Sequence, residues 1–415
     1  MQDTIPTIDP GLTPPPIKGV AALAHRAFAG QGLPELLQFL GRPVASEPAM
    51  AALALDCALA HMLHFRPQQA SAMQALALDR ACLFRVAESF AARGKRPLRV
   101  LALMAPGDLM MNTPLDFITA HLDVQLDLMF VLPGRPLPER IPEHDVAFFA
   151  VSESDSATLR RLAPLFPLWP RPALNDPAQV ARLTRDGVAA ALASAPGVAA
   201  PCIVAISRQD LLAHLAAGAP IDRLLPGCDY PVLLRPVGTH AGIGLARLDA
   251  PEALATHLAE HATERFFLAN FIDYRGPDGL FRKYRVAFIG GAPFVCHVAS
   301  SQHWMVHYLN AGMVESEAKR AMEASAFAEF DAGFAQRHRA ALAAIDGWIG
   351  LDYHQIDCAE TPEGRLLLFE ADTAAIVHMM DPPDLFPYKP PQMRRVVDAF
   401  GAMLKRRVMG TLAAA

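Results

Sequence analysis

The sequence lacks the features that mark secreted, disulfide-bonded and zinc-stabilised proteins. Its six cysteines are scattered and include no C-x-x-C pair, which fits neither a disulfide framework nor a zinc site and favours a reducing compartment. The first residues, MQDTIPTIDPGLTPPP, are acidic and proline-rich where a signal peptide needs a basic segment followed by an apolar one. We therefore expect a cytoplasmic protein.

Long apolar runs and an excess of basic residues are also missing. Runs such as 100–105 and 146–151 are far shorter than the about 20 residues of a membrane helix, so they predict buried strands and no membrane partner. The formal net charge is -5, and basic residues form no block, so we expect no nucleic-acid partner. With 415 residues, of which 52% are hydrophobic, the chain predicts a globular protein of two or three domains.

Changes in sequence pattern divide the chain into four regions. Residues 1–18 contain five prolines and predict a flexible lead-in. Residues 19–95 predict a helical region, because Ala and Leu recur between a start signal at Ser46 and a stop at Gly94. This region resembles a tetratricopeptide-like unit without a clear repeat array, so packing helices and a protein-interaction module both remain open.

From residue 96 onward the sequence pattern predicts the fold class α/β (α+β). Residues 96–200 alternate short apolar runs with helical segments, which predicts a small parallel α/β domain. Residues 201–405 read as strand, glycine-rich loop, strand and helix, followed by two strand pairs. The segments whose residues indicate ligand or metal binding lie in these two regions.

One signal is the glycine-rich segment RPVGTHAGIG, residues 235–244. Gly238, Gly242 and Gly244 have no side chain, so backbone N–H groups of this loop could approach a polyphosphate closely. Arg235 adds a fixed positive charge. An ordinary turn is the alternative for such a loop.

A second signal is a group of three carboxylates on two strands joined by the turn TPEG. Glu370 and Asp372 share one strand face because side chains alternate, and a regular hairpin places Asp357 within a residue or two of being opposite Glu370. Clustered carboxylates are costly unless a cation neutralises them, and such oxygen ligands suit Mg²⁺ carrying nucleotide phosphates. Exposed edge-strand charges are the alternative.

In chain order, these motifs resemble the ATP-grasp superfamily, in particular glutathione synthetase and the glutamate ligases that modify ribosomal protein. The resemblance covers roughly residues 97–400 and implies an ATP-grasp fold preceded by the small parallel α/β domain and the N-terminal helical region. The segments that carry it are LLRPVGTHAGIG, LANFIDY, FRKYRVAFIGG, YLNAGM, and Asp357 with Glu370, Ala371 and Asp372.

The resemblance implies an enzyme that uses ATP and Mg²⁺ to ligate a small-molecule or peptide carboxylate to an amine through an acyl phosphate. It implies catalytic roles for Arg285 and Asn310, and phosphate contacts from Arg235 and the loop glycines. The backbone around the hinge would hold adenine, and Asp273 would bind ribose; the hinge residues are Ala269, Asn270, Phe271, Ile272 and Asp273. Asp357, Glu370 and Asp372 would bind Mg²⁺, with Asn310 assisting.

The sequence departs from the family pattern at three points. Arg235 stands where a lysine is usual, a second lysine is missing from RLTRDGVAAAL, where Arg185 is the nearest substitute, and Asp372 replaces an asparagine. A nucleotide-binding regulator on the same fold therefore remains open, as does a scaffold that binds a protein partner through residues 20–94. A homodimer is also left open by the resemblance.

Overall fold

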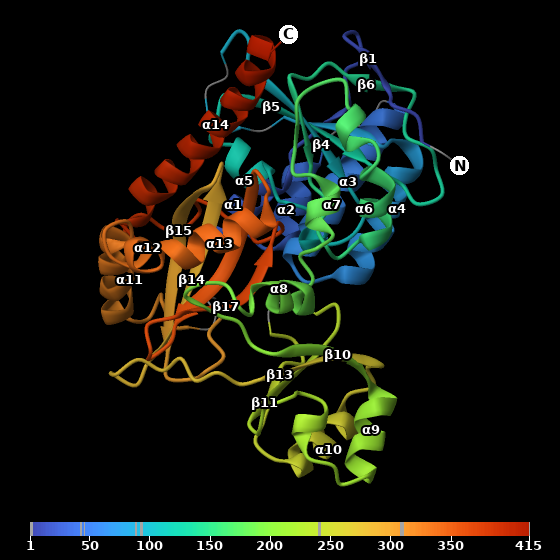
Figure 1. Ribbon diagram of the computed structural model, residues 1–415. Coiled ribbons are helices and arrows are strands. Elements are labelled where there is room, and N and C mark those ends of the chain that lie inside the picture. The colour runs from blue at the N-terminus through green and yellow to red at the C-terminus, as the bar shows by residue number, and fades with distance from the viewer. Residues whose placement is uncertain are drawn as a thin grey trace.

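The computed structural model describes residues 3–41, 44, 46–87, 89–91, 94–239, 242–307 and 311–414. In Figure 1 an N-terminal α/β unit lies at the upper right, a C-terminal sheet with its helices lies at the left, and a small lobe lies at the bottom. No helix within these ranges is long and apolar enough to cross a membrane.

The N-terminal unit contains a six-stranded sheet in the order β2-β3-β5-β4-β7-β8. All neighbouring pairs are parallel except β3 with β5. The strands are β2 (Pro16–Ile17), β3 (Leu83–Val86), β4 (Leu98–Met104), β5 (Val124–Phe130), β7 (Val146–Phe149) and β8 (Ala173–Leu174), and a separate parallel pair is formed by β1 (Thr7–Asp9) and β6 (Arg140–Pro142).

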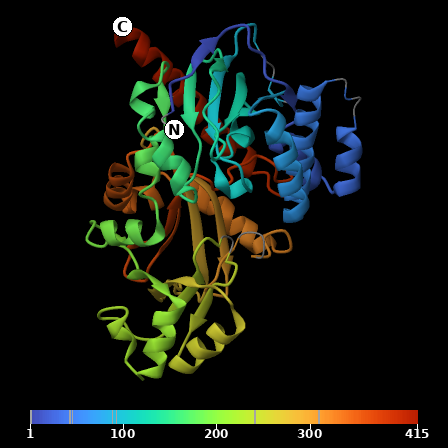
Figure 2. The ribbon, with the colours of Figure 1, turned by 90° about the vertical axis from the view of Figure 1, so that its right-hand side faces the viewer.

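Helices of the N-terminal region gather on one side of this sheet (Figure 2). The expected start at Ser46 is present, since its side chain accepts a hydrogen bond from the backbone N–H of Ala49 at 3.4 Å. The helices of this unit are α1 (Val20–Phe28), α2 (Leu33–Leu40), α3 (Glu47–Leu63), α4 (Pro67–Arg80), α5 (Asp116–Thr119), α6 (Ser156–Leu162) and α7 (Pro177–Val180), with 3-10 turns η1 (Leu109–Met111) and η2 (Phe166–Leu168).

Two expectations for the N-terminal region are wrong. The lead-in is not free, because Pro16 and Ile17 pair with Arg85 and Val86, and Ile17 is fully buried. Proline is tolerated there because β2 is an edge strand. Leu83–Val86 is a strand instead of part of a helix, so residues expected in the helical region share one sheet with the α/β domain.

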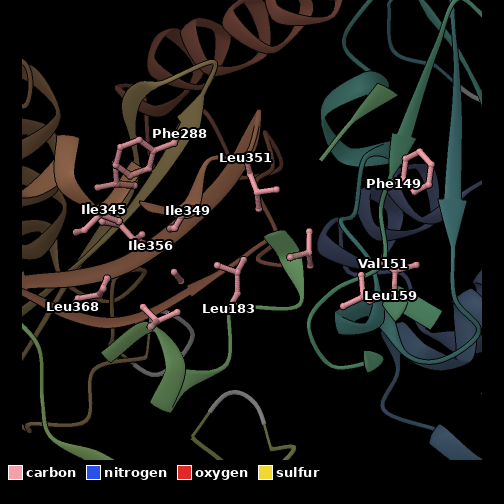
Figure 3. Packing of buried hydrophobic residues seen from close by; sticks show 14 of the residues in the cluster. Phe149, Val151, Leu159, Leu183, Phe288, Ile345, Ile349, Leu351, Ile356 and Leu368 are labelled. Carbon is pink, nitrogen blue, oxygen red and sulfur yellow. The ribbon is translucent and has the colours of Figure 1, made fainter. Parts of the chain in front are cut away.

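The C-terminal sheet has five strands in the order β15-β14-β16-β17-β9. The strands are β9 (Val198–Ala199), β14 (Phe281–Ile289), β15 (Ala292–Ser301), β16 (Tyr353–Glu360) and β17 (Leu366–Asp372), and the helices around them are α8 (Arg185–Leu192), α11 (Glu317–Glu329), α12 (Phe334–Arg337), α13 (Arg339–Ile349) and α14 (Lys389–Ala414). One continuous cluster of buried side chains joins this sheet to the N-terminal unit, from Phe149 and Val151 to Phe288 and Ile356 (Figure 3).

The small lobe is a four-stranded antiparallel sheet in the order β10-β13-β11-β12 with helices on one side. Ser207 caps its first helix by accepting from the N–H of Asp210 at 3.1 Å, as the S-x-x-D spacing predicts. The elements are β10 (Ile203–Ser207), β11 (Val232–Pro236), β12 (Ala246–Leu248), β13 (Arg265–Asn270), α9 (Arg208–Ala216), η3 (Ile221–Arg223) and α10 (Pro251–Glu260). The lobe lies at the far end of the molecule from β1 and β6 (Figure 1).

Candidate functional site

Three neighbouring strands of the C-terminal sheet place a row of charges side by side. Asp357 on β16 lies directly opposite Glu370 on β17 and opposite Arg285 on β14, so the expected hairpin register is confirmed. Arg285 donates from Nε and from a terminal nitrogen to the two Asp357 oxygens, at 2.8 and 2.9 Å. Lys283 shares the strand face of Arg285, because side chains alternate, and its Nζ lies 2.6 Å from Asp357 Oδ2.

Asp357 is therefore a buried carboxylate with two cationic partners. Only 2% of the residue is exposed. Burial by itself raises the pKa of Asp357, but Arg285 and Lys283 outweigh that effect and hold the pKa well below its usual range. The group remains ionised at neutral pH.

Arg185 brings a third cation to the neighbouring carboxylate. It is the first residue of α8, and it forms an ion pair with Glu370. Burial alone raises the pKa of Glu370, yet Arg185 shifts the balance and lowers it. Arg235 at the end of β11 also lies near this pair: burial and then the charge of Arg185 lower its pKa to about 10. Arg185, the nearest substitute for the second lysine that the sequence resemblance leads one to expect, is thus part of the site.

A small pocket borders this row of charges, and we call it the acidic pocket. It is lined by Met110, Glu153, Leu183, Arg185, Glu370, Ala371, Asp372 and Ala374. Burial, followed by repulsion from Glu370, raises the pKa of Asp372 to about 6. Asp372 Oδ1 accepts from the N–H groups of Ala374 and Ala375 at 2.9 and 2.7 Å, which fixes its position on the wall.

Glu153 is a member of the acidic pocket that sequence reasoning missed. It follows β7 of the N-terminal sheet, and its buried Oε2 has no hydrogen-bond partner. Burial, and then Asp372, raise the pKa of Glu153 to about 8. Its position after a parallel strand was a usable signal, because ligands of α/β sheets bind beyond the carboxyl ends of the strands.

The carboxylates do not form a ready-made metal cage. Within the described ranges, no group of three or more His, Cys, Asp or Glu residues is arranged to hold a metal ion. Arginine and lysine partners engage Asp357 and Glu370. The donor chemistry nevertheless fits Mg²⁺ at the acidic pocket: Glu153 and Asp372 have raised pKa values, and a dication would relieve that repulsion. The Mg²⁺ role of Asp357, Glu370 and Asp372 stays a prediction.

The glycine-rich segment joins β11 to β12, which form an antiparallel pair. Gly238, Gly242 and Gly244 have φ angles of 79°, 75° and 68°, a region that favours glycine. At Gly244 an added Cβ would lie 2.8 Å from Pro236 Cγ, so the loop requires a residue without a side chain there. Arg235 donates to the carbonyl of Thr239 and so holds the loop beside its own strand.

The hinge residues lie at the end of β13 and just after it. The backbone N–H groups of Asn270 and Phe271 donate to the carbonyls of Cys202 and Pro231, both at 3.2 Å. These two N–H groups are therefore used inside the small lobe, and the adenine and ribose contacts expected of residues 269–273 stay a prediction. Ala269 lies within the sheet, paired with Ile203 and Leu233.

The two residues expected to be catalytic have different outcomes. Asn310 lies outside the described residues. Arg285 is in the site, but it is committed to Asp357 through two hydrogen bonds. The other cations described around the carboxylates are Lys283, Arg185 and Arg235. Lys283 could have been identified from the sequence, because it lies two residues before Arg285 and therefore shares its strand face.

Replacing Glu153 with glutamine should stabilise the protein at pH 9 and have little effect at pH 5. The folded-state pKa, about 8, lies above the ordinary value of 4.5, so wild-type stability is fully present below pH 4.5 and is lost as the pH rises through 8. We expect a gain of about 2–5 kcal/mol at pH 9. The rise from 4.5 to about 8, at about 1.4 kcal/mol per pKa unit, sets the upper value, and the part of the repulsion that belongs to Asp372 lowers it. Urea denaturation in EDTA at both pH values measures it, with the exposed Glu139→Gln as the control. An equal gain at pH 5 and pH 9 would contradict this explanation.

Comparisons with known proteins find similarity at the level of solved structures. No family model matches the chain, and no curated protein matches it. It is similar to the VanG D-Ala:D-Ser ligase from Enterococcus faecalis, with 13% identity, a TM-score of 0.46, and coverage of 74% of this chain and 100% of that one. A RimK domain ATP-grasp protein from Sphaerobacter thermophilus matches with 16% identity, a TM-score of 0.41, and coverage of 75% and 99%.

A third similar structure is the D-alanine-D-alanine ligase from Coxiella burnetii, with 12% identity, a TM-score of 0.44, and coverage of 76% of this chain and 98% of that one. The name of the Sphaerobacter protein contains that of the superfamily that the sequence motifs resemble.

Proposed function

We propose that this protein is an ATP-dependent carboxylate-amine ligase with an ATP-grasp architecture. One observation carries the proposal: cations and carboxylates from three separate parts of the chain converge on the acidic pocket. Arg185 comes from α8, Glu370 and Asp372 come from β17, and Glu153 comes from the segment that follows β7. Arg235 lies at the start of the glycine-rich loop. The charges of Arg185 and Glu370 act on the pKa of Arg235, and Arg235 in turn lowers the pKa of Glu370.

This arrangement suits phosphoryl transfer, in which the protein supplies position and fixed charge. Arg185 and Arg235 would neutralise phosphate oxygens, and the loop glycines would allow the backbone to approach them. Lys283 adds a cation on the neighbouring strand. Mg²⁺, held by Glu370 and Asp372 with phosphate oxygens, would supply further charge neutralisation.

The reaction itself needs no protein nucleophile. The γ-phosphoryl group passes to the substrate carboxylate, giving an acyl phosphate and ADP, and the amine then displaces phosphate. The chain's part is to align the two reactants and to stabilise negative charge as it moves. Arg185 is well placed for this role, because it is partly buried and already fixed by Glu370.

A second candidate, a nucleotide-binding regulator, has one observation in its favour. Asp357 and Glu370 are paired with cations of the protein itself, and such pairing competes with metal binding. A regulator would bind nucleotide without consuming it. ADP release that depends on an added carboxylate and amine would eliminate this candidate.

The test of the proposed function is the thermal unfolding midpoint with and without Mg-ATP, followed by an ADP-release screen. A ligand that binds only the native state at about 100 times its Kd adds roughly 2.7 kcal/mol, so a clear upward shift is expected for the wild type. Glu370→Ala should lose the shift. Glu363→Ala is the matched control, because Glu363 is exposed in the turn of the same hairpin. No shift for the wild type, beside a positive control protein, would remove the proposal.

A further inference from the structure

The segment that follows β17 starts at the acidic pocket and leads away from it. The structure describes all of residues 374–380, which form neither helix nor strand, and we call them the connector. The backbone N–H groups of Ala374 and Ala375 donate to Asp372 Oδ1 at 2.9 and 2.7 Å, and Ala374 also lines the pocket. The position of the Asp372 carboxylate therefore depends on the position of the connector.

Side chains of the connector pack alternately against two different cores. Val377 belongs to the buried cluster that contains Tyr353 of β16, and Met379 packs against the same cluster. Ile376 and Met380 pack against a separate cluster of the N-terminal unit. This alternation is typical of an extended segment, in which neighbouring side chains point to opposite sides. The connector thus lies between the core of the C-terminal sheet and the N-terminal helices.

The N-terminal cluster that supports the connector is built mainly from α1, and we call it the α1 cluster. Its buried members are Val20, Ala21 and Ala24 of α1, Phe117 of α5, and Ala120. Positions three and four apart share a helix face, and Leu23 belongs instead to a cluster with Leu36 of α2. At the end of α1, the Phe28 ring lies 5.6 Å from the ring of His378 in the connector, measured between centroids.

A second wall of the acidic pocket rests on the same cluster. Leu109 of η1 packs against the α1 cluster, and the next residue, Met110, lines the acidic pocket. The carbonyl of Met110 accepts from the hydroxyl of Ser152 at 3.0 Å, and Ser152 directly precedes Glu153. The α1 cluster therefore supports the segment beside Glu153 as well as the segment that fixes Asp372.

These two carboxylates need such support because they repel each other. Both line the acidic pocket, and the charge of Asp372 contributes to the raised pKa of Glu153. Packing that holds the two segments together opposes this repulsion. Groups that orient the ligands of a metal ion also contribute strongly to its affinity. Loosening the α1 cluster should therefore weaken metal binding even where the ligands themselves are unchanged.

We propose that α1 is a positioning element of the acidic pocket, and that Ile376 and Phe28 are the residues through which it holds Asp372 in place. Neither residue touches a ligand, since each acts through the connector. The inference rests on the proposed function for the identity of the ligand, Mg-ATP. It makes the N-terminal helical region part of the ligand-binding unit, in addition to any surface that this region offers to a protein partner.

The first arm of the test measures Mn²⁺ binding to the full chain by electron paramagnetic resonance, in the presence of the non-hydrolysable ATP analogue AMP-PNP. Ile376→Ala should raise the Kd of Mn²⁺ about tenfold, the loss typical of removing a group that orients a metal ligand. Ile376→Val, which keeps most of the packing, should stay within about threefold of the wild type. Thermal midpoints are measured first, and binding is compared at a temperature where every variant is folded.

Leu40→Ala is the control for loss of packing. Leu40 is 2% exposed and packs with Leu23 of α1, away from the connector. Its truncation should lower the thermal midpoint at least as much as Ile376→Ala does, because a buried side chain is removed. The Kd of Mn²⁺ should nevertheless remain that of the wild type, since the α1 cluster and the connector keep their contacts.

The second arm approaches the same contact from α1. Phe28 is 53% exposed, so Phe28→Ala should fold normally. The Kd of Mn²⁺ should rise about twofold to tenfold, the range that corresponds to the loss of one aromatic pair. Phe65→Ala is the matched control, because it makes the same change in the N-terminal unit at a residue that is 87% exposed.

The outcomes separate the inference from the proposed function. Wild type should bind Mn²⁺ with AMP-PNP, and Glu370→Ala should not. If that holds while Ile376→Ala and Phe28→Ala both keep the wild-type Kd, the inference alone is overturned. An equal rise in Kd for Leu40→Ala would indicate general loosening of the N-terminal unit and would overturn it as well. No binding of Mn²⁺ and AMP-PNP by the wild type would remove the proposed function, and the positioning role with it.

Discussion

Replacing Asp357 with asparagine is expected to lower the free energy of unfolding by about 3–5 kcal/mol, because two largely buried cations lose the carboxylate that both contact. Arg285 and Lys283 both contact the Asp357 carboxylate, and an amide can accept a hydrogen bond but cannot neutralise them. Urea denaturation near pH 7 measures the difference. The difference in free energy of unfolding between wild type and variant should become smaller in acid. The pKa of Asp357 is held below its ordinary value of 3.8, so the stabilisation by its carboxylate is present above pH 3.8 and disappears as the pH falls through the folded-state pKa.

Asp278→Asn is the matched control for this prediction. Asp278 forms an ion pair with Arg282 on the same strand, β14, but its side chain is 48% exposed. Exposed pairs contribute about 0–1 kcal/mol, so this variant should remain close to the wild type. If the two variants lost the same small amount, the Asp357 carboxylate would not be the buried counter-charge that the contacts indicate.

The local part of the site could be predicted from the sequence. Strand alternation and the short turn TPEG place Asp357 within a residue or two of being opposite Glu370, and a register shift between Asp357 and Cys358 makes the two residues direct partners. The glycine-rich segment likewise forms a turn between two paired strands. Both predictions depend on contacts within about ten to fifteen residues, where backbone geometry leaves few alternatives.

The long-range part of the site was not predictable in the same way. Glu153 and Asp372 are more than 200 residues apart, and their proximity depends on how the N-terminal unit packs on the C-terminal sheet through Phe149, Val151 and Ile356. Arg85 of β3 bonds to Asp127 of β5 at 2.7 Å, a partner that the helical reading of this segment concealed. Pairings of this kind are set by tertiary packing, which overrides local propensity.

Arg185→Ala is expected to reduce ADP release about 100- to 1000-fold, the loss typical of removing one fixed group that stabilises transition-state charge. Two effects act together: phosphate loses a cation, and Glu370 loses the partner that lowers its pKa most. The Glu370 carboxylate then faces Asp372 and Glu153 with only the more weakly acting Lys283 and Arg235 to compensate. Arg185→Lys should recover part of the activity, because it restores the charge without the planar fork that can bind two oxygens at once.

The measurement for Arg185 separates chemistry from stability. Single-turnover ADP formation at saturating Mg-ATP is compared among wild type, Arg185→Lys and Arg185→Ala, and urea denaturation is run on the same samples. Arg182→Ala is the matched control: Arg182 precedes the same helix, but its guanidinium lies over the Trp348 ring, 4.5 Å from the ring centroid, and not in the acidic pocket. Turnover of Arg185→Ala within about threefold of wild type would show that Arg185 only holds Glu370 in place. It would move the phosphate-binding role to Arg235 and Lys283, because these cations flank the same carboxylates from β11 and β14.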